Sequence, residues 1–497
     1  YSIRPNSSSR VTTPIHRYSV NQQIKINLSD NTNLAFGVRL TDEKIKNDIS
    51  VNNGGATITS SGNENNTDQN YTISFNQRYS NSLKTSFRGY FTEYNAKQDL
   101  VTLSGDPYYD LLNHRFQRVE NQTDWNVRKN LNILFGAGAV WEGVKSTRYD
   151  SEKVRKNNSI QYGFTQVEYT PLQKLILIGG VRFDKNETYA SAFSPKLSAL
   201  YKVNAKHKIK LSIGQGFKAP DFRQLYLNFT NAAAGGYSVF GSVEAQKVVE
   251  QLNSLGQIGN LFDNYYQLKK LEPEYATGIH LSAEWEPNQS NEIQVQLFRN
   301  DINNLIDVQQ VGNYISGSQI YSYLNIKNAY TTGLEIETKQ KYNSHWSSNF
   351  GYQFLVTGDK DQIAKIKTGI VYTKNTDGTS RLLTLSDYVG LPNTSKHRFQ
   401  AKLNYENQEG FYANIRAIYR SKWAVANTNG NEVYDNGDQF GKGYITLNFS
   451  TGKQFKNGWA LQAGIDNINN HIDGMNLPNL AGRTYYMILK YSIQNKK

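Results

Sequence analysis

The stretch Thr484-Tyr-Tyr-Met-Ile-Leu-Lys-Tyr-Ser-Ile-Gln494, near the C-terminus, alternates residue by residue between two kinds of side chain. One face carries five apolar or aromatic residues, namely Tyr485, Met487, Leu489, Tyr491 and Ile493. The other face carries Tyr486, Lys490, Ser492 and Gln494. A period of two is typical of a β-strand whose faces meet different surroundings. The odd-numbered residues are therefore predicted to face lipid, and Lys490 to face an aqueous lumen.

The same alternation recurs upstream, in segments around residues 459–465, 445–449 and 209–213. Each segment has roughly the 9–11 residues that a tilted strand needs to cross a membrane, and no apolar run approaches the ~18–20 residues of a membrane helix. The mean hydropathy of −0.63 looks soluble, but 12% aromatic content argues against a disordered chain. A barrel reconciles these values, because only alternate residues face lipid. We predict an all-β, transmembrane antiparallel β-barrel over residues 1–497.

The predicted connections fall into two classes. Short polar turns are expected at Ser29–Asn33, Ser80–Ser82, Val127–Asn130, Pro171–Lys174, Asn204–Lys206, Pro287–Ser290, Asn343–His345, Asn407–Gly410 and Lys456–Gly458. Long loops are expected at Asn47–Gln69, Lys97–Asn113, Val144–Asn157, Ala219–Glu274, Gly358–Lys396, Ala424–Gly441 and Asn469–Gly482. Short turns at one end and long loops at the other are typical of outer-membrane barrels. The alternative, a large soluble β-protein such as a propeller, is disfavoured because no repeat of ~40–50 residues is apparent.

Composition excludes several classes of function. The chain has no Cys, so it has neither a disulfide framework nor thiolate metal sites. The net charge of +13 suits a basic lumen or rim, or a generic basic surface, but the cations are scattered and predict no nucleic-acid partner. The segment Gly214-Gln-Gly216-Phe-Lys-Ala219 imitates a dinucleotide fingerprint, but Pro220 follows where a helix should begin. No catalytic constellation stands out, so we predict no enzyme activity, cofactor or metal site.

Several motifs resemble TonB-dependent outer-membrane receptors. They are Gly216-Phe-Lys-Ala-Pro-Asp-Phe-Arg-Gln-Leu-Tyr226, Leu271-Glu-Pro-Glu274, Leu297-Phe-Arg-Asn-Asp-Ile-Asn-Asn-Leu-Ile306, Asn325-Ile-Lys-Asn-Ala329, Gly333-Leu-Glu335, Leu391-Pro-Asn-Thr-Ser-Lys-His397, Ile465-Asp-Asn-Ile468 and Gly482-Arg-Thr-Tyr-Tyr486. They occur in the family's order over the C-terminal part of the chain, whereas the first 200 residues match by pattern only.

The resemblance implies a 22-stranded barrel that holds an N-terminal plug domain, in the bacterial outer membrane. About nineteen strands are predicted here, so the family would place about three more strands and the plug outside this sequence. The implied partners are outer-membrane lipid, the plug and through it TonB, a small ligand, and in some members a surface lipoprotein.

The resemblance also implies active import of a scarce, bulky nutrient, most simply an iron chelate such as a ferric siderophore or haem. Vitamin B12 uptake is the alternative within the family. Haem-type members carry a His after the Phe-Arg-Ala-Pro motif, but no His lies between Pro220 and Glu274 here, which disfavours haem. His114 and His471 lie near predicted loops and are more simply ordinary loop residues than ligands. Two other classes of function stay open, a passive or secretion channel and a surface-binding structural barrel.

The longest predicted loop, Ala219–Glu274, is expected to be extracellular and to contact the ligand. It is unusually rich in aromatic residues, which supply large and fairly rigid contact areas. Its candidate ligand-binding residues are Arg223, Tyr226, Tyr237, Phe240, Tyr265 and Tyr266. The residues Val243–Leu255 fit an amphipathic helix, either a lid or a helix packed on its neighbours. The alternative is that the aromatic residues form only a small core of the loop. Deletion of Ala232–Asn260 is predicted to abolish uptake and to spare the barrel.

Overall fold

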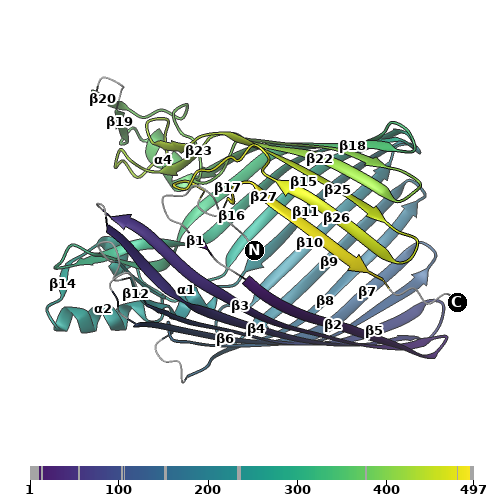
Figure 1. Ribbon diagram of the computed structural model, residues 1–497, viewed down its shortest axis with the longest axis horizontal. Coiled ribbons are helices and arrows are strands. Elements are labelled where there is room, and N and C mark those ends of the chain that lie inside the picture. Colours follow the sequence, from purple (N-terminus) through teal and green to yellow (C-terminus); the bar gives the residue numbers. More distant parts are fainter. Residues whose placement is uncertain are drawn as a thin grey trace.

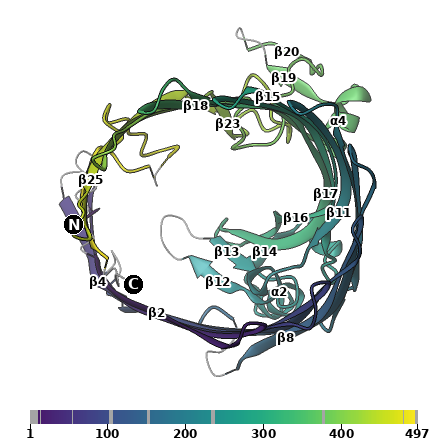
Figure 2. The same cartoon turned by 90° about the vertical axis from the view of Figure 1, so that its right-hand side faces the viewer.

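The computed structural model describes residues 11–12, 15–53, 56–101, 105, 107–149, 154–231, 237–374, 378–477 and 480–492. One large, almost entirely antiparallel sheet dominates it and curves into a ring around an open lumen (Figure 2). No helix of this part of the chain is long and apolar enough to cross a membrane.

Nineteen strands form the barrel wall, and each pairs with its neighbours in chain order. They are β2 (Ile15–Ser29), β3 (Thr32–Asn53), β4 (Ala56–Arg78), β5 (Leu83–Val101), β6 (Pro107–Arg128), β7 (Leu131–Ser146), β8 (Lys156–Leu172), β9 (Leu175–Asn186), β10 (Ala192–Lys202), β11 (His207–Lys218), β15 (Glu274–Asn288), β16 (Asn291–Tyr314), β17 (Gln319–Lys341), β18 (Trp346–Asp359), β21 (His397–Glu406), β22 (Phe411–Arg420), β25 (Tyr444–Gln454), β26 (Trp459–Asp466) and β27 (Thr484–Tyr491). The short strand β1 (Val11–Thr12) pairs with the end of β3. The predicted fold class and strand number are confirmed.

The two faces of β27 separate as predicted. Leu489 and Met487 are 63% and 75% exposed on the outer surface, opposite Leu461 and Ala463 of β26. Tyr486 lines a hollow in the lumen wall, and Lys490 lies on the same face as Tyr486 because the two are four residues apart along the strand. The predicted register is confirmed from Tyr485 to Tyr491, whereas Ile493 lies outside the described residues.

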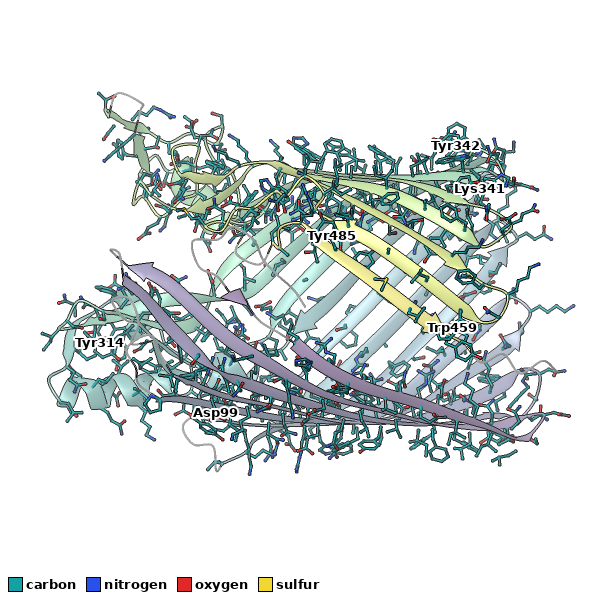
Figure 3. The ribbon with its side chains drawn as sticks, in the orientation of Figure 1. Asp99, Tyr314, Lys341, Tyr342, Trp459 and Tyr485 are labelled. Atoms are coloured by element: carbon teal, nitrogen blue, oxygen red, sulfur yellow. The ribbon has the colours of Figure 1, made fainter. Side chains whose placement is uncertain are left out.

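The nine predicted short turns all lie at one end of the barrel, between the ends of paired strands. Four of the six Trp residues lie on the outer surface close to these turns, namely Trp125, Trp285, Trp346 and Trp459. Trp rings at that depth are typical of the aromatic girdle at a membrane interface. Figure 3 shows Lys341, Tyr342 and Trp459 at this short-turn end and Tyr314 at the opposite, loop end.

The prediction of a long loop was wrong for two segments, which form paired strands instead. Residues 47–53 and 56–69 continue β3 and β4, which pair as far as Asn53 and Ala56. Similarly, β5 and β6 continue through most of the segment 97–113 and pair as far as Val101 and Pro107. Beyond the bilayer both faces of a strand are wetted, so the alternation of apolar and polar residues disappears although the backbone pairing continues. Pattern-based prediction therefore ends such strands too early.

Smaller elements gather at the loop end. The predicted loop 358–396 contains α4 (Lys360–Lys367) and the hairpin of β19 (Tyr372–Lys374) and β20 (Ser380–Leu382), which lie outside the ring in Figure 2. The next loop contains β23 (Trp423–Ala426) and β24 (Gln439–Gly441). The two loops share a small core of Ile366, Val371, Leu383 and Val433. The connections at the loop end therefore form small folded units with their own core instead of extended chain.

Candidate functional site

The segment between β11 and β15 folds into a compact unit over the loop end of the barrel. It contains α1 (Phe222–Tyr226), β12 (Asn228–Asn231), β13 (Tyr237–Phe240), α2 (Ala245–Ser254), β14 (Ile258–Leu261) and α3 (Asp263–Tyr266). The predicted amphipathic helix is α2. In Figure 1 the unit lies at the end opposite the short turns, and in Figure 2 β12, β13 and α2 project inside the outline of the ring. The unit therefore narrows the mouth of the lumen.

This loop unit is attached to the barrel by backbone pairing. Strand β13 pairs in parallel with residues 319–322 of β17, and β14 pairs antiparallel with residues 312–314 of β16. The resulting small sheet has the order β12-β13-β17-β16-β14 and extends the β16–β17 hairpin beyond the membrane. Pairing on both sides of a rigid hairpin fixes the position of the loop relative to the lumen.

An apolar core holds α2 against this sheet. Phe240 and Val249 are 2% and 0% exposed, and they pack with Val311, Ile320 and other apolar residues of β16 and β17. A side chain buried this fully is unavailable for direct contact with a ligand. The expectation that Phe240 contacts a ligand therefore needs correction, because this ring stabilises the loop from within.

A second core lies beneath α1. Asp221 caps the helix by accepting a hydrogen bond from the Gln224 backbone at 2.7 Å, while the Gln224 side chain accepts from the Asp221 backbone at 2.9 Å. This reciprocal pair is a capping box. It directs Leu225 into a core with Leu271 and Tyr323. The start of the loop, its end and β17 are thereby joined.

Two cations contact the loop unit from the side, Arg148 of the β7–β8 connection and Lys156 at the start of β8. The Arg148 guanidinium lies 2.6 Å from Asp110, donates to the Tyr108 hydroxyl at 2.9 Å and stacks over Phe229 at 5.2 Å. Lys156 lies over the Tyr226 ring at 4.9 Å and 3.6 Å from Glu244. Cations over aromatic faces are attractive, more so when they are shielded from water.

Tyr149 reinforces this contact from the same connection. Burial raises the pKa of Tyr149 to about 12, and the nearby Asp221 carboxylate adds to the rise. The phenol therefore stays neutral at physiological pH and packs against the second core. The loop unit is thus held to both of its neighbours along the barrel rim.

The six predicted ligand residues separate into different environments. Arg223 and Tyr266 are exposed, the latter at 74%. Tyr237 is 39% exposed and meets Tyr321 edge-on at 6.3 Å. Tyr226 is half-buried beneath Lys156, and Tyr265 packs against the α2 core. The surface available to a ligand is therefore smaller than predicted, with Arg223, Tyr237 and Tyr266 at its accessible points.

A pocket of about 390 Å³ lies beside Tyr266. It is lined by Tyr266, Gln267, Leu268, Lys269, Leu324 and Asn325. Lys269, Arg148 and Lys156 were not identified from the sequence. For Lys269 a signal was present, because the run Tyr265-Tyr-Gln-Leu-Lys-Lys270 joins aromatic and basic residues. The pocket offers an aromatic face, amide groups and a cation to a polar, anionic ligand.

Several His side chains contact neighbouring protein groups. His207 and His345 lie at the short-turn end of the barrel. His114 is in β6 rather than in a loop, with Nε2 2.6 Å from the Glu142 carboxylate. His471 stacks on Tyr444 at 4.8 Å. Within the described ranges, no group of three or more His, Cys, Asp or Glu side chains is placed to hold a metal ion.

A wide antiparallel barrel with an apolar outer band, a polar lumen and a partly covered mouth defines an outer-membrane receptor or channel. The family model described as "TonB dependent receptor-like, beta-barrel" matches residues 4–468. The chain belongs to this family of transport receptors, which places it in the bacterial outer membrane.

Named relatives are distant. The "Iron-regulated outer membrane virulence protein" of Vibrio cholerae (El Tor Inaba N16961) is 19% identical over 322 residues, 64% of this chain and 41% of the relative. The chain thus spans about two fifths of that relative's length. A second Vibrio cholerae protein of the same name, from strain O395, is 24% identical over 116 residues, 23% of this chain and 18% of its own length.

Solved structures share the fold at low identity. A ferric enterobactin receptor of Pseudomonas aeruginosa (PfeA) has a TM-score of 0.69 at 13% identity and covers 99% of this chain and 72% of its own. The siderophore receptor PirA of the same organism has a TM-score of 0.59 at 13% identity, with 99% and 79% covered. The copper transporter OprC has a TM-score of 0.67 at 12% identity, with 96% and 74% covered.

Proposed function

We propose that this chain forms the barrel of a receptor that imports an anionic iron chelate across the outer membrane, energised through TonB. The observation that carries the proposal is the mouth of the barrel. There the 219–274 loop unit carries the exposed residues Arg223 and Tyr266 and the pocket beside Lys269. Aromatic faces and cations together suit a flat, negatively charged ligand. A relative with iron-regulated expression and neighbours that are siderophore receptors agree with an iron chelate.

Copper import is less well supported, although one structural neighbour is a copper transporter. Copper sites favour the soft donors Cys and Met together with His. This chain has no Cys and two Met, of which Met487 faces outward in β27 and Met475 lies in the β26–β27 connection. A chelate bound through its organic shell needs none of these donors.

Uptake by living cells tests the substrate class. The full-length receptor is produced in cells that lack their own iron-chelate receptors, and import of radioactive iron as ferric enterobactin or haem is compared with import of radioactive vitamin B12. We expect iron to accumulate from ferric enterobactin and not from haem. Import of vitamin B12 alone would contradict an iron-chelate receptor.

Ligand binding should depend on Tyr266 and Lys269. The double variant Tyr266→Ala/Lys269→Gln is expected to weaken chelate binding to cells by roughly 10- to 100-fold, since it removes one aromatic contact and one charge-assisted hydrogen bond. A matched variant, Lys341→Gln/Tyr342→Ala, makes the same chemical changes at the short-turn end, where Tyr342 is 56% exposed (Figure 3). Equal binding by both variants would place the ligand elsewhere.

Further strands are proposed to complete the wall. Strands β2 and β27 are the edges of the sheet, and no backbone pair joins them within the described ranges. Unpaired backbone groups in hydrocarbon cost several kcal/mol each, so both edges need partners in the membrane. We expect about three additional strands between them, as in 22-stranded receptors. Cysteines at Val20 and Leu489 should fail to form a disulfide in the full-length protein, and rapid cross-linking would show direct closure instead.

A further inference from the structure

Six cations on the lumen face of the barrel wall lie directly opposite a carboxylate on the adjacent strand. Such pairs are Arg17 with Glu43, Lys84 with Asp124, Arg88 with Glu120, Lys208 with Glu284, Lys218 with Glu274 and Lys339 with Glu292. Opposite charges that face each other across two strands stabilise the sheet. These six lumen cations are thus neutralised within the wall.

Strands β21 and β22 instead place two cations opposite each other at two positions. Lys402 lies opposite Arg416, and Arg398 lies opposite Arg420. Two other like-charged pairs occur in the described wall, Arg78 opposite Lys84 and Lys202 opposite Lys208. One cation of each pair also has a carboxylate partner, because Lys84 lies 3.3 Å from Asp124 and Lys208 lies 2.6 Å from Glu284.

No carboxylate of the described residues lies within ion-pair distance of the four cations on β21 and β22. Arg420 donates only to the Ser395 hydroxyl at 2.6 Å and the Asn393 carbonyl at 2.7 Å. Like charges held directly opposite each other destabilise a sheet. The described residues therefore provide no carboxylate partner for these four positive charges.

The Lys402–Arg416 pair lines a hollow of about 510 Å³ in the lumen wall. Besides Lys402 and Arg416, the hollow is lined by amide and hydroxyl groups of Gln400, Asn414, Gln462 and Tyr486. Glu337 and Asp466 also border it, without forming an ion pair with either cation. Arg416 donates one hydrogen bond to Gln400 at 3.0 Å and keeps further donors free for a ligand. Convergent cations and amides are the donors that bind oxyanions.

The two pairs stand at successive depths of the lumen. Arg420 ends β22 at the rim, where its guanidinium stacks on Trp423 at 4.1 Å. Arg416 lies four residues before Arg420 in β22, which places it about 13 Å closer to the short-turn end along the strand at ~3.3 Å per residue. A ligand that leaves the mouth would meet the Arg398–Arg420 pair first and the Lys402–Arg416 hollow next.

We propose that the Lys402–Arg416 hollow is a transit subsite that binds an anionic oxygen group, such as a carboxylate, of the imported substrate within the lumen. The transport role rests on the proposed function, whereas anion binding does not. The two unbalanced pairs form a short positive track from the rim inward. Salt screens exposed charges, so binding there is expected to be weak enough to release the substrate.

Anion binding is tested on the purified full-length receptor by following its thermal unfolding midpoint during a citrate titration. Citrate that binds the folded state raises the midpoint by an amount that grows with the ratio of the citrate concentration to its dissociation constant. We expect a rise for the wild type and its loss in the double variant Lys402→Gln/Arg416→Gln. The control Lys196→Gln/Lys210→Gln removes two lumen-facing charges from the adjacent strands β10 and β11, where they oppose neutral residues, and should keep the rise. An equal rise in all three proteins would overturn the subsite.

Transport is tested separately with ferric enterobactin as the probe. The variant Lys402→Gln/Arg416→Gln should reduce the maximal uptake rate about tenfold, the loss expected for a charge-assisted hydrogen bond, and leave cell-surface affinity unchanged. Lys402→Glu places a carboxylate opposite Arg416, so it should raise the unfolding midpoint while reducing uptake at least as much. Normal uptake by both variants would mean that the charges serve protein contacts, which overturns the transit role. If wild-type cells import no chelate, the proposed function fails, while the citrate titration still decides the subsite.

Discussion

Cells that produce the Phe240→Ala variant are expected to insert a normal barrel but to lose tight chelate binding. Phe240 is 2% exposed and lies in the core that joins α2 to the β16–β17 hairpin. Removing a fully buried phenyl group costs about 3–5 kcal/mol, which approaches the stability of a small folded unit. The loop unit should therefore unfold locally, while the backbone pairing of the wall persists.

Hydrogen exchange measures this effect residue by residue. The amides of α2, β13 and β14 should lose protection in Phe240→Ala, whereas those of β4 and β5 should keep it. The control is Phe262→Ala, which removes a phenyl group of the same loop that is 37% exposed and should change stability far less. Unchanged protection of α2 in Phe240→Ala would contradict a loop unit held by this core.

The deletion of Ala232–Asn260 predicted from the sequence is a less specific test in the light of the structure. It would remove β13, α2 and most of β14, and would uncover Val311 and Ile320, which are both fully buried. Loss of uptake after such a change would mix an exposed apolar surface with a lost ligand contact. Point substitutions separate the two effects.

Leu489→Arg should destabilise the barrel by about 2–4 kcal/mol, because it places a charge against hydrocarbon. Leu489 and Met487 are the outward residues between Tyr485 and Tyr491, which lie toward the two ends of β27. Lys490→Gln, one residue away on the lumen face, should have little effect. Urea unfolding of the full-length protein in lipid vesicles measures both changes. Equal destabilisation by the two variants would contradict the assigned faces of β27.

The membrane-spanning part of the fold was predictable because lipid imposes a simple rule: apolar residues that face lipid alternate with residues that face the lumen. Alternation around Leu211, Leu447 and Leu489 and the nine polar turns followed from that rule. Beyond the bilayer this rule ends, so the sequence pattern predicts loops where the outer parts of β3 to β6 continue as paired strands. The interval Ala219–Glu274 was bounded correctly because β11 and β15, on either side, lie in lipid.

The candidate site was predictable in composition but not in arrangement. The sequence predicts that the aromatic residues of this loop contact the ligand. In the structure Phe240 is buried whereas Tyr266 is exposed. The pairing of β13 with β17 decides which ring is covered. The lumen cations were harder to find. Lys402 and Arg416 look like ordinary scattered charges in the sequence, and their opposition depends on the register of β21 with β22. Patterns within one strand contain no information on such pairs.

Chelate uptake through this receptor is expected to depend on TonB. Cells that carry the full-length receptor and import ferric enterobactin are compared with otherwise identical cells that lack TonB. We predict that cells without TonB still bind the chelate at their surface but accumulate no iron, because the outer membrane has no ATP or ion gradient of its own to drive import. Undiminished accumulation without TonB would contradict an energised receptor and would indicate a passive channel.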